Sequence, residues 1–100
     1  MAGNRIDLWG RILAEPELRT TPAGTSVLRI TVQAADRPAD FALDAVIMGD
    51  EARRLGARLK AGAEVTVKGN LKAVRRRLKS GLNETIYEIA ADSIDMRSQK

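Results

Sequence analysis

Residues 41–71, FALDAVIMGDEARRLGARLKAGAEVTVKGNL, decide the fold because their hydrophobic period changes twice. In residues 41–48 the side chains of Leu43, Ala45 and Ile47 fall on one parity, which is typical of a strand that turns one face toward the core. Apolar residues then recur at helical spacing from Ala52 to Leu59, and residues 64–74 return to alternation. The stretch therefore predicts a strand, a short helix of about three turns and another strand.

The predicted helix has signals at both ends. Asp50 is expected to be its N-cap, because a carboxylate at this position accepts hydrogen bonds from the free amides of the first turn. Arg58 and Lys60 would complement the helix dipole at the other end, and Gly62 would end the helix.

Two alternating segments precede this stretch and one follows it. Residues 4–13 and 27–34 are predicted strands, separated by Pro16 and a turn at residues 21–24, and residues 84–95 are the last strand. Ile94 breaks the alternation of that strand, which predicts a β-bulge. The positions expected to face the core are Ile6, Leu8, Gly10, Ile12, Leu28, Ile30, Val32, Leu43, Ala45, Ile47, Val65, Val67, Gly69, Leu71, Tyr87, Ile89 and Ala91.

These elements predict one domain over residues 1–100, with an ordered core at 4–96 and frayed residues at 97–100. The protein should be mainly β. Five short strands with a short α-helix between the third and the fourth close naturally into a small Greek-key barrel, the OB-fold.

The composition excludes several kinds of chemistry. The chain has no cysteine and no histidine, which excludes disulfides, thiolate nucleophiles and histidine-dependent triads. Asp36, Asp40 and Asp44 recur every fourth residue, but in a loop and strand they do not form a convincing two-metal site. We expect no enzyme and no cofactor.

No apolar run has the length of a signal peptide or a membrane span, so a cytoplasmic protein is expected.

The positive charge is concentrated in one segment. Lys72, Arg75, Arg76, Arg77 and Lys79 contribute more than the whole net charge of +4, so the rest of the chain is close to neutral. Such a segment suggests a polyanionic partner. Residues 75–82 are predicted to form a projecting basic loop, turned at Ser80-Gly81, in which guanidinium groups bind phosphates.

Further residues on outward-facing positions are candidates for the same interface. Asp44 argues against a fully cationic surface. Either it pairs with Arg29 or Lys68 on a neighbouring strand, or the path of the ligand avoids it. Trp9 either stacks on a base or packs in a subunit interface, and Phe41 is expected to pack under the loop around Pro38. The candidate nucleic-acid-binding residues are Lys72, Arg75, Arg76, Arg77, Lys79, Arg11, Arg29, Lys68 and Trp9, of which Arg76 is preferred because it can also stack.

Several ordered motifs carry a family resemblance over nearly the whole chain. They are NRI at 4–6, Gly10, PELR at 16–19, TPAG at 21–24, Gly49, LKAG at 59–62, VTVKGNL at 65–71 and Gly81. In these motifs and their spacing the chain resembles the bacterial single-stranded DNA-binding protein family. The resemblance implies single-stranded DNA as the ligand and a homodimer.

Within that family the chain looks most like the short primosomal replication protein N branch, which implies replication-restart proteins as partners. The long members carry a tail with an acidic tip, whereas this sequence ends at Lys100, and it has Ala42, Met48 and Arg76 where they typically place aromatic residues. Two other functions stay open. An adaptor would use the basic loop to bind an acidic protein, and an OB module of this size can also bind RNA.

Overall fold

The computed structural model describes residues 4–36 and 41–97. Among these residues no helix is long and apolar enough to cross a membrane. The described part of the chain forms six strands and one helix, in the order β1 (Arg5–Ile12), β2 (Glu17–Thr20), β3 (Ser26–Ala34), β4 (Ala42–Met48), α1 (Asp50–Gly56), β5 (Glu64–Arg77) and β6 (Asn83–Met96).

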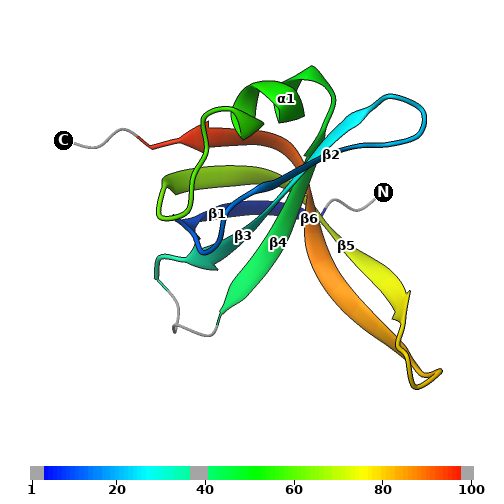
Figure 1. Ribbon diagram of the computed structural model, residues 1–100. Helices are drawn as coiled ribbons and strands as arrows, with labels where there is room; N and C mark the ends of the chain where they lie inside the picture. The colour runs from blue at the N-terminus through cyan, green and yellow to red at the C-terminus, as the bar shows by residue number, and fades with distance from the viewer. Residues whose placement is uncertain (1–3, 37–40, 98–100) are drawn as a thin grey trace.

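The strands form one sheet in the order β1-β5-β6-β4-β3-β2. All neighbours are antiparallel except β4 and β6, which are parallel. The end of β1 also pairs with β3, from Gly10 opposite Ala34 to Ile12 opposite Val32, and this seam closes the sheet into a barrel (Figure 1). The predicted OB-fold barrel is confirmed.

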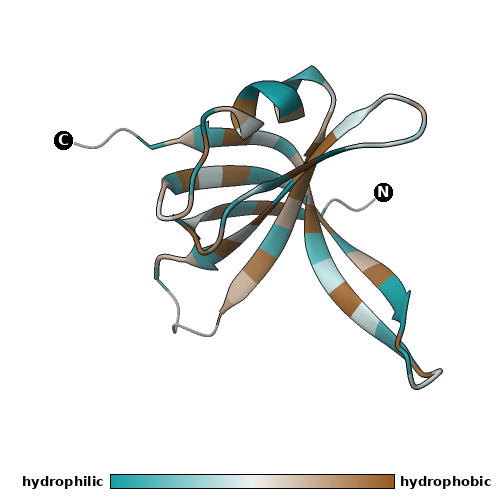
Figure 2. Ribbon diagram, in the orientation of Figure 1, coloured by the Kyte–Doolittle hydropathy of each residue, from teal (hydrophilic) through white to brown (hydrophobic). Residues whose placement is uncertain are grey.

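Alternation along the strands places one set of side chains inside the barrel. In β3 every second residue is buried, from Ser26 to Ala34, as the sequence pattern predicted. Figure 2 shows this alternation as hydrophobic and hydrophilic bands along the strands. Helix α1 packs against β2, β3 and β4 and adds Ala52 and Leu55 to the core. The core cluster comprises Ile12, Leu28, Ile30, Val32, Ala45, Ile47, Ala52, Leu55, Leu59, Val65, Val67, Ile89 and Ile94.

Close backbone approach at the seam requires a glycine. A Cβ atom added to Gly10 would lie 1.9 Å from the carbonyl oxygen of Gln33 and 2.7 Å from its carbonyl carbon. No real Cβ approaches backbone atoms so closely, so a side chain at this position would force β1 away from β3.

The bulge predicted near the end of the last strand is confirmed. Lys68 pairs with Ser93, but the next residue of β5, Gly69, pairs with Ala91, so Asp92 is the extra residue of β6. This extra residue changes the alternation of β6 and lets Ile94 point into the core, where it is buried.

The helix is shorter than predicted, and its predicted cap is wrong. Helix α1 has seven residues, and its N-cap is Gly49, with a φ of 89° and no capping side chain. The backbone N–H of Gly49 donates to the carbonyl of Ser26, which fixes the chain one residue before Asp50. Asp50 therefore begins the helix, where it pairs with Arg53, and Arg58 lies after the helix has ended.

Strand β2 was not predicted. Its four residues pair with β3, from Glu17 opposite Arg29 to Thr20 opposite Ser26, around the predicted turn at residues 21–24. Every residue of β2 is exposed, so its sequence carries no alternating pattern that would reveal a strand. The β2–β3 hairpin matters for function because it forms one side of the groove described below.

Candidate nucleic-acid interface

The basic segment lies mainly in one strand, β5, and the prediction of a basic loop over residues 75–82 is wrong. Strand β5 continues to Arg77, and Arg75, Arg76 and Arg77 pair with Thr85, Glu84 and Asn83 of β6. Only residues 78–82 form the turn, in which the N–H of Leu78 donates to the carbonyl of Leu82. Strand pairing therefore holds the three arginines on a hairpin that projects from the barrel (Figure 1).

The projecting hairpin has two faces, because directly paired residues of antiparallel strands share a face and neighbours along a strand alternate. We call them the groove face and the free face. The groove face carries Lys72, Val74 and Arg76 from β5 with Glu84, Ile86 and Glu88 from β6. The free face carries Ala73, Arg75 and Arg77 with Asn83, Thr85 and Tyr87.

A groove of about 430 Å³ runs between the hairpin and the outer surface of β2, β3 and β4. Its lining combines an apolar part with charged residues of both signs, and it includes no aromatic side chain. Because the groove is lined from five strands, no single sequence motif marks it. The lining residues are Val27, Val74 and Ile86, then Arg19, Arg29, Arg75 and Arg76, and the acidic Glu17, Asp44 and Glu88.

Arg29 is held in the groove by two carboxylates. Its Nη1 donates to Asp44 Oδ2 at 3.0 Å and to Glu88 Oε1 at 2.9 Å, and Thr31 Oγ1 donates to Asp44 Oδ1 at 2.7 Å. Burial opposes the charge of Arg29, but hydrogen bonds and the charges of Glu88 and Asp44 outweigh it, so the pKa of Arg29 is raised. Of the two partners predicted for Asp44, Arg29 is confirmed and Lys68 is not.

Arg76 also has a carboxylate partner. Its Nη2 and Nε lie 2.5 Å and 3.2 Å from Glu84 Oε2, across the hairpin on the groove face. Sequence reasoning missed this pair because Glu84 is eight residues further along the chain, beyond the turn. Both side chains are partly exposed, so the ion pair is weak.

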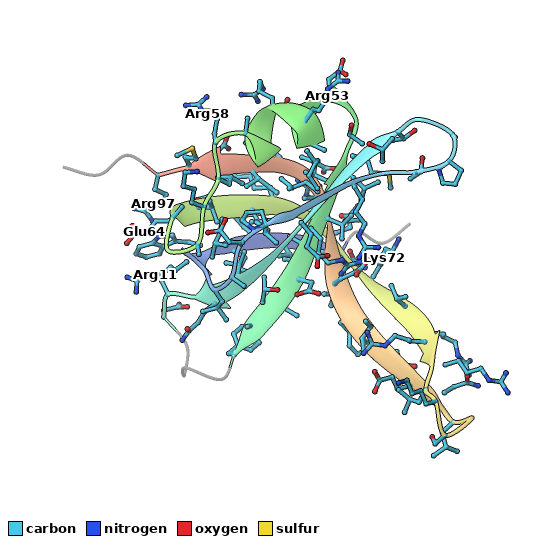
Figure 3. The ribbon with its side chains drawn as sticks, viewed as in Figure 1. Arg11, Arg53, Arg58, Glu64, Lys72 and Arg97 are labelled. Carbon is cyan, nitrogen blue, oxygen red and sulfur yellow. The ribbon has the colours of Figure 1, made fainter. Side chains whose placement is uncertain are left out.

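The other cations of the basic segment have no ion pair with any residue that the structure describes. Lys72, Arg75, Arg77 and Lys79 are all exposed. They lie along the hairpin from its base, where Figure 3 shows Lys72, to the turn that contains Lys79. An extended anion next to the hairpin would therefore meet four unpaired positive charges.

Three of the candidate residues lie elsewhere on the barrel. Lys68 lies in the middle of β5, between Asp7 of β1 and Ser93 of β6. Arg11 Nη2 lies 4.0 Å from Glu64 Oε2, and Figure 3 shows both at the end of the barrel away from the hairpin.

The third of these residues, Trp9, borders a smaller pocket of about 200 Å³ beside Arg11 and Glu64. The residue is 45% exposed, and the guanidinium carbon of Arg97 lies 3.9 Å from the centroid of its ring. A cation–π contact with Arg97 thus covers part of the ring. This contact was not predicted, since Trp9 was expected either to stack on a base or to pack in a subunit interface.

Of the aromatic residues, Tyr87 was predicted to lie in the core, and this prediction is wrong. Its residue exposure is 57%, although it shares parity with the buried Ile89. Strands β5 and β6 run past the end of the barrel. At Tyr87 the side that faces the core further along β6 therefore faces no other strand. Phe41 is partly exposed, and the segment around Pro38 under which it was expected to pack lies outside the described residues.

Among the described residues, no group of three or more acidic side chains is placed to hold a metal ion. What the structure shows is a closed OB barrel with a groove across its outer strands and a cationic hairpin beside the groove. In OB-fold proteins this part of the barrel, with the adjacent loops, is where oligonucleotides and oligosaccharides bind.

Comparison with known proteins identifies the family. The family model described as the single-strand binding protein family matches residues 3–97, and the chain belongs to this family. It is 30% identical over 105 residues to single-stranded DNA-binding protein 1 of Staphylococcus aureus strain MSSA476, covering 97% of this chain and 67% of that protein.

A protein of Oceanobacillus iheyensis, named single-stranded DNA-binding protein, is also 30% identical over 105 residues, covering 97% of this chain and 65% of that protein. The chain thus spans about two thirds of the length of these two curated relatives.

Proposed function

We propose that this protein binds single-stranded DNA with low sequence preference and without catalysis, along the groove and the projecting hairpin. The observation that carries the proposal is that the groove and the unpaired cations of the hairpin form one continuous surface. The groove contributes an apolar part and four arginines to it. Unpaired bases can contact the apolar residues while phosphates contact the cations. Neither contact reads base edges, so little sequence preference is expected. The relatives named as single-stranded DNA-binding proteins support this choice of ligand.

The residues of the site have different roles in this proposal. Lys72, Arg75, Arg77 and Lys79 bind phosphates, because they are exposed and no ion pair holds them within the described residues. Arg76 joins them after it exchanges Glu84 for a phosphate. Arg29 shapes the groove, since Asp44 and Glu88 hold its guanidinium.

Candidate residues outside the groove are not part of the proposed path. Arg11, Lys68 and Trp9 lie on other parts of the barrel, and both Arg11 and Trp9 border the smaller pocket. Their contribution to binding is expected to be limited to the general electrostatic field of the protein.

A salt titration tests the proposed function. If four or five phosphates are neutralised, log K for an oligothymidylate should fall against log salt with a slope of about −3, because each phosphate contact on a single strand contributes about −0.7. Fluorescence anisotropy measures this slope, with a duplex of the same length as the control. Binding that is absent at low salt, or equally tight for the duplex, would contradict the proposed function.

We also propose a homodimer formed through β1. Residues 5–8 of β1 pair with β5 on one side only, since the contact with β3 and the residue after it begins at Trp9, whose carbonyl accepts from the N–H of Ala35. An open strand edge is a template for pairing with another chain. Sedimentation equilibrium at micromolar concentration should give twice the 10.9 kDa mass of one chain, and the mass of a single chain would rule the dimer out.

The cellular role we propose is replication restart or DNA maintenance in the cytoplasm, with replication-restart proteins as partners. Two features support it. The sequence motifs resemble the short primosomal branch, and the groove is lined by no aromatic residue among those described. With few stacked bases, binding is governed by charge, which suits short contacts with a strand that other proteins also handle.

A further inference from the structure

The free face of the hairpin differs from the groove face in burial. All six of its residues are exposed, whereas on the groove face Val74, Glu84 and Ile86 are half-buried and Glu88 is buried. No described element packs over the free face. The free face is therefore available to a ligand along its whole length of three residue pairs.

The two faces also differ in charge. On the groove face Arg76 pairs with Glu84, and Lys72 lies directly opposite Glu88. The free face has Arg75 and Arg77 and no carboxylate. Neither arginine has an ion pair within the described part of the chain. The free face thus has two unpaired cations and no carboxylate, whereas the groove face has one unpaired cation, Lys72, and two carboxylates.

Tyr87 provides an aromatic ring on this cationic face. It is directly opposite Ala73, whose small side chain leaves the ring uncovered, and Arg75 is its diagonal neighbour across the two strands. An exposed aromatic ring beside cations that contact phosphates is the combination on which single-stranded nucleic acids stack their bases. A protein partner with acidic side chains would use the two arginines but would not need the ring.

We propose that the free face is a second subsite for single-stranded DNA, in which one base stacks on Tyr87 while Arg75 and Arg77 bind the flanking phosphates. The inference rests on the proposed function and extends it to the free face of the hairpin, of whose two arginines Arg75 also borders the groove. A DNA strand bound in the groove then continues around the hairpin and contacts both of its faces.

Substitution of Tyr87 separates stacking from charge. Tyr87→Ala should weaken binding of an oligothymidylate about tenfold and leave the salt slope unchanged, because a stacked base but no phosphate contact is lost. Tyr87→Phe should bind as the wild type does, since stacking needs only the ring. The control is Leu82→Ala, which removes an exposed apolar side chain from the turn of the same hairpin and should leave affinity unchanged.

The chain has a single tyrosine, so a direct readout is available. Incorporation of 3-fluorotyrosine gives one ¹⁹F resonance, which should shift when the oligothymidylate is added and should not shift with polyglutamate. Thermal melting monitors folding of each variant, and the exposure of Tyr87 predicts that Tyr87→Ala remains folded.

The outcomes are distinguishable. Wild-type affinity for Tyr87→Ala together with an unchanged ¹⁹F resonance would overturn the second subsite and leave the proposed function standing. Failure of the wild type to bind the oligothymidylate would overturn both. A Tyr87→Ala variant that binds normally but has a lower mass in sedimentation would assign the free face to contact between copies of this chain, which also overturns the subsite.

Discussion

Replacement of Arg75, Arg76 and Arg77 together with alanine is expected to weaken binding of single-stranded DNA at least tenfold at low salt. The three residues lie in consecutive positions of β5, and their guanidinium groups serve both faces of the hairpin. Loss of three phosphate contacts should also reduce the magnitude of the salt slope by about 2. Fluorescence anisotropy with an oligothymidylate measures both quantities. All three side chains are exposed, so the domain should stay folded.

A control variant with the same change in net charge tests whether position matters. Arg53→Ala with Arg54→Ala and Arg58→Ala removes three arginines in and just after α1, where Figure 3 shows Arg53 and Arg58 far from Lys72 and the hairpin. This control should lose little affinity. Equal losses in the two triple variants would mean that binding responds only to net charge, and the hairpin would have no special role.

Substitution of Gly10 should have the largest effect on stability. Gly10→Ala is expected to lower the free energy of unfolding by about 3 kcal/mol or more, because the added Cβ would overlap the backbone carbonyl of Gln33 at 1.9 Å. Backbone atoms within a closed barrel cannot give way as the end of a flexible side chain can. Urea denaturation followed by circular dichroism measures the change.

Gly62→Ala is the matched control for this effect. Gly62 has a φ of 90°, which an alanine adopts at a cost of about 1 kcal/mol, but no heavy atom lies within 4 Å of an added Cβ. It should therefore be destabilised much less than Gly10→Ala. If the two variants have the same free energy of unfolding, steric contact at the seam does not decide the stability of the barrel.

The fold was predictable from the sequence because most strands have one buried face. Alternation in β3, β4 and the first part of β5 placed Leu28, Ala45 and Val67 in the core, where the structure has them. Strand β2 escaped prediction because all its residues are exposed. The helix start was missed because glycine at positive φ, rather than a capping carboxylate, makes the turn into α1.

The site was predictable in its charge but not in its geometry. The cationic segment is visible in the sequence, yet the strand pairing that divides it into two faces depends on residues beyond the turn. Alternation alone assigned Tyr87 to the core. A sequence pattern shows which residues share a face of a strand, but it does not show where along the strand the barrel ends. Of the two partners of Arg29, Asp44 was proposed from its outward parity on a neighbouring strand, whereas Glu88 lies on β6, 59 residues away along the chain, and was missed.

The pairing of Arg76 with Glu84 means that this protein carries its own competitor for DNA. In the free protein the carboxylate occupies the guanidinium that a phosphate would use, so association trades one anion for another instead of filling an empty position. In the proposed function this exchange makes the net contribution of Arg76 to binding smaller than that of an unpaired arginine on the same hairpin, by no more than the small free energy of an exposed ion pair.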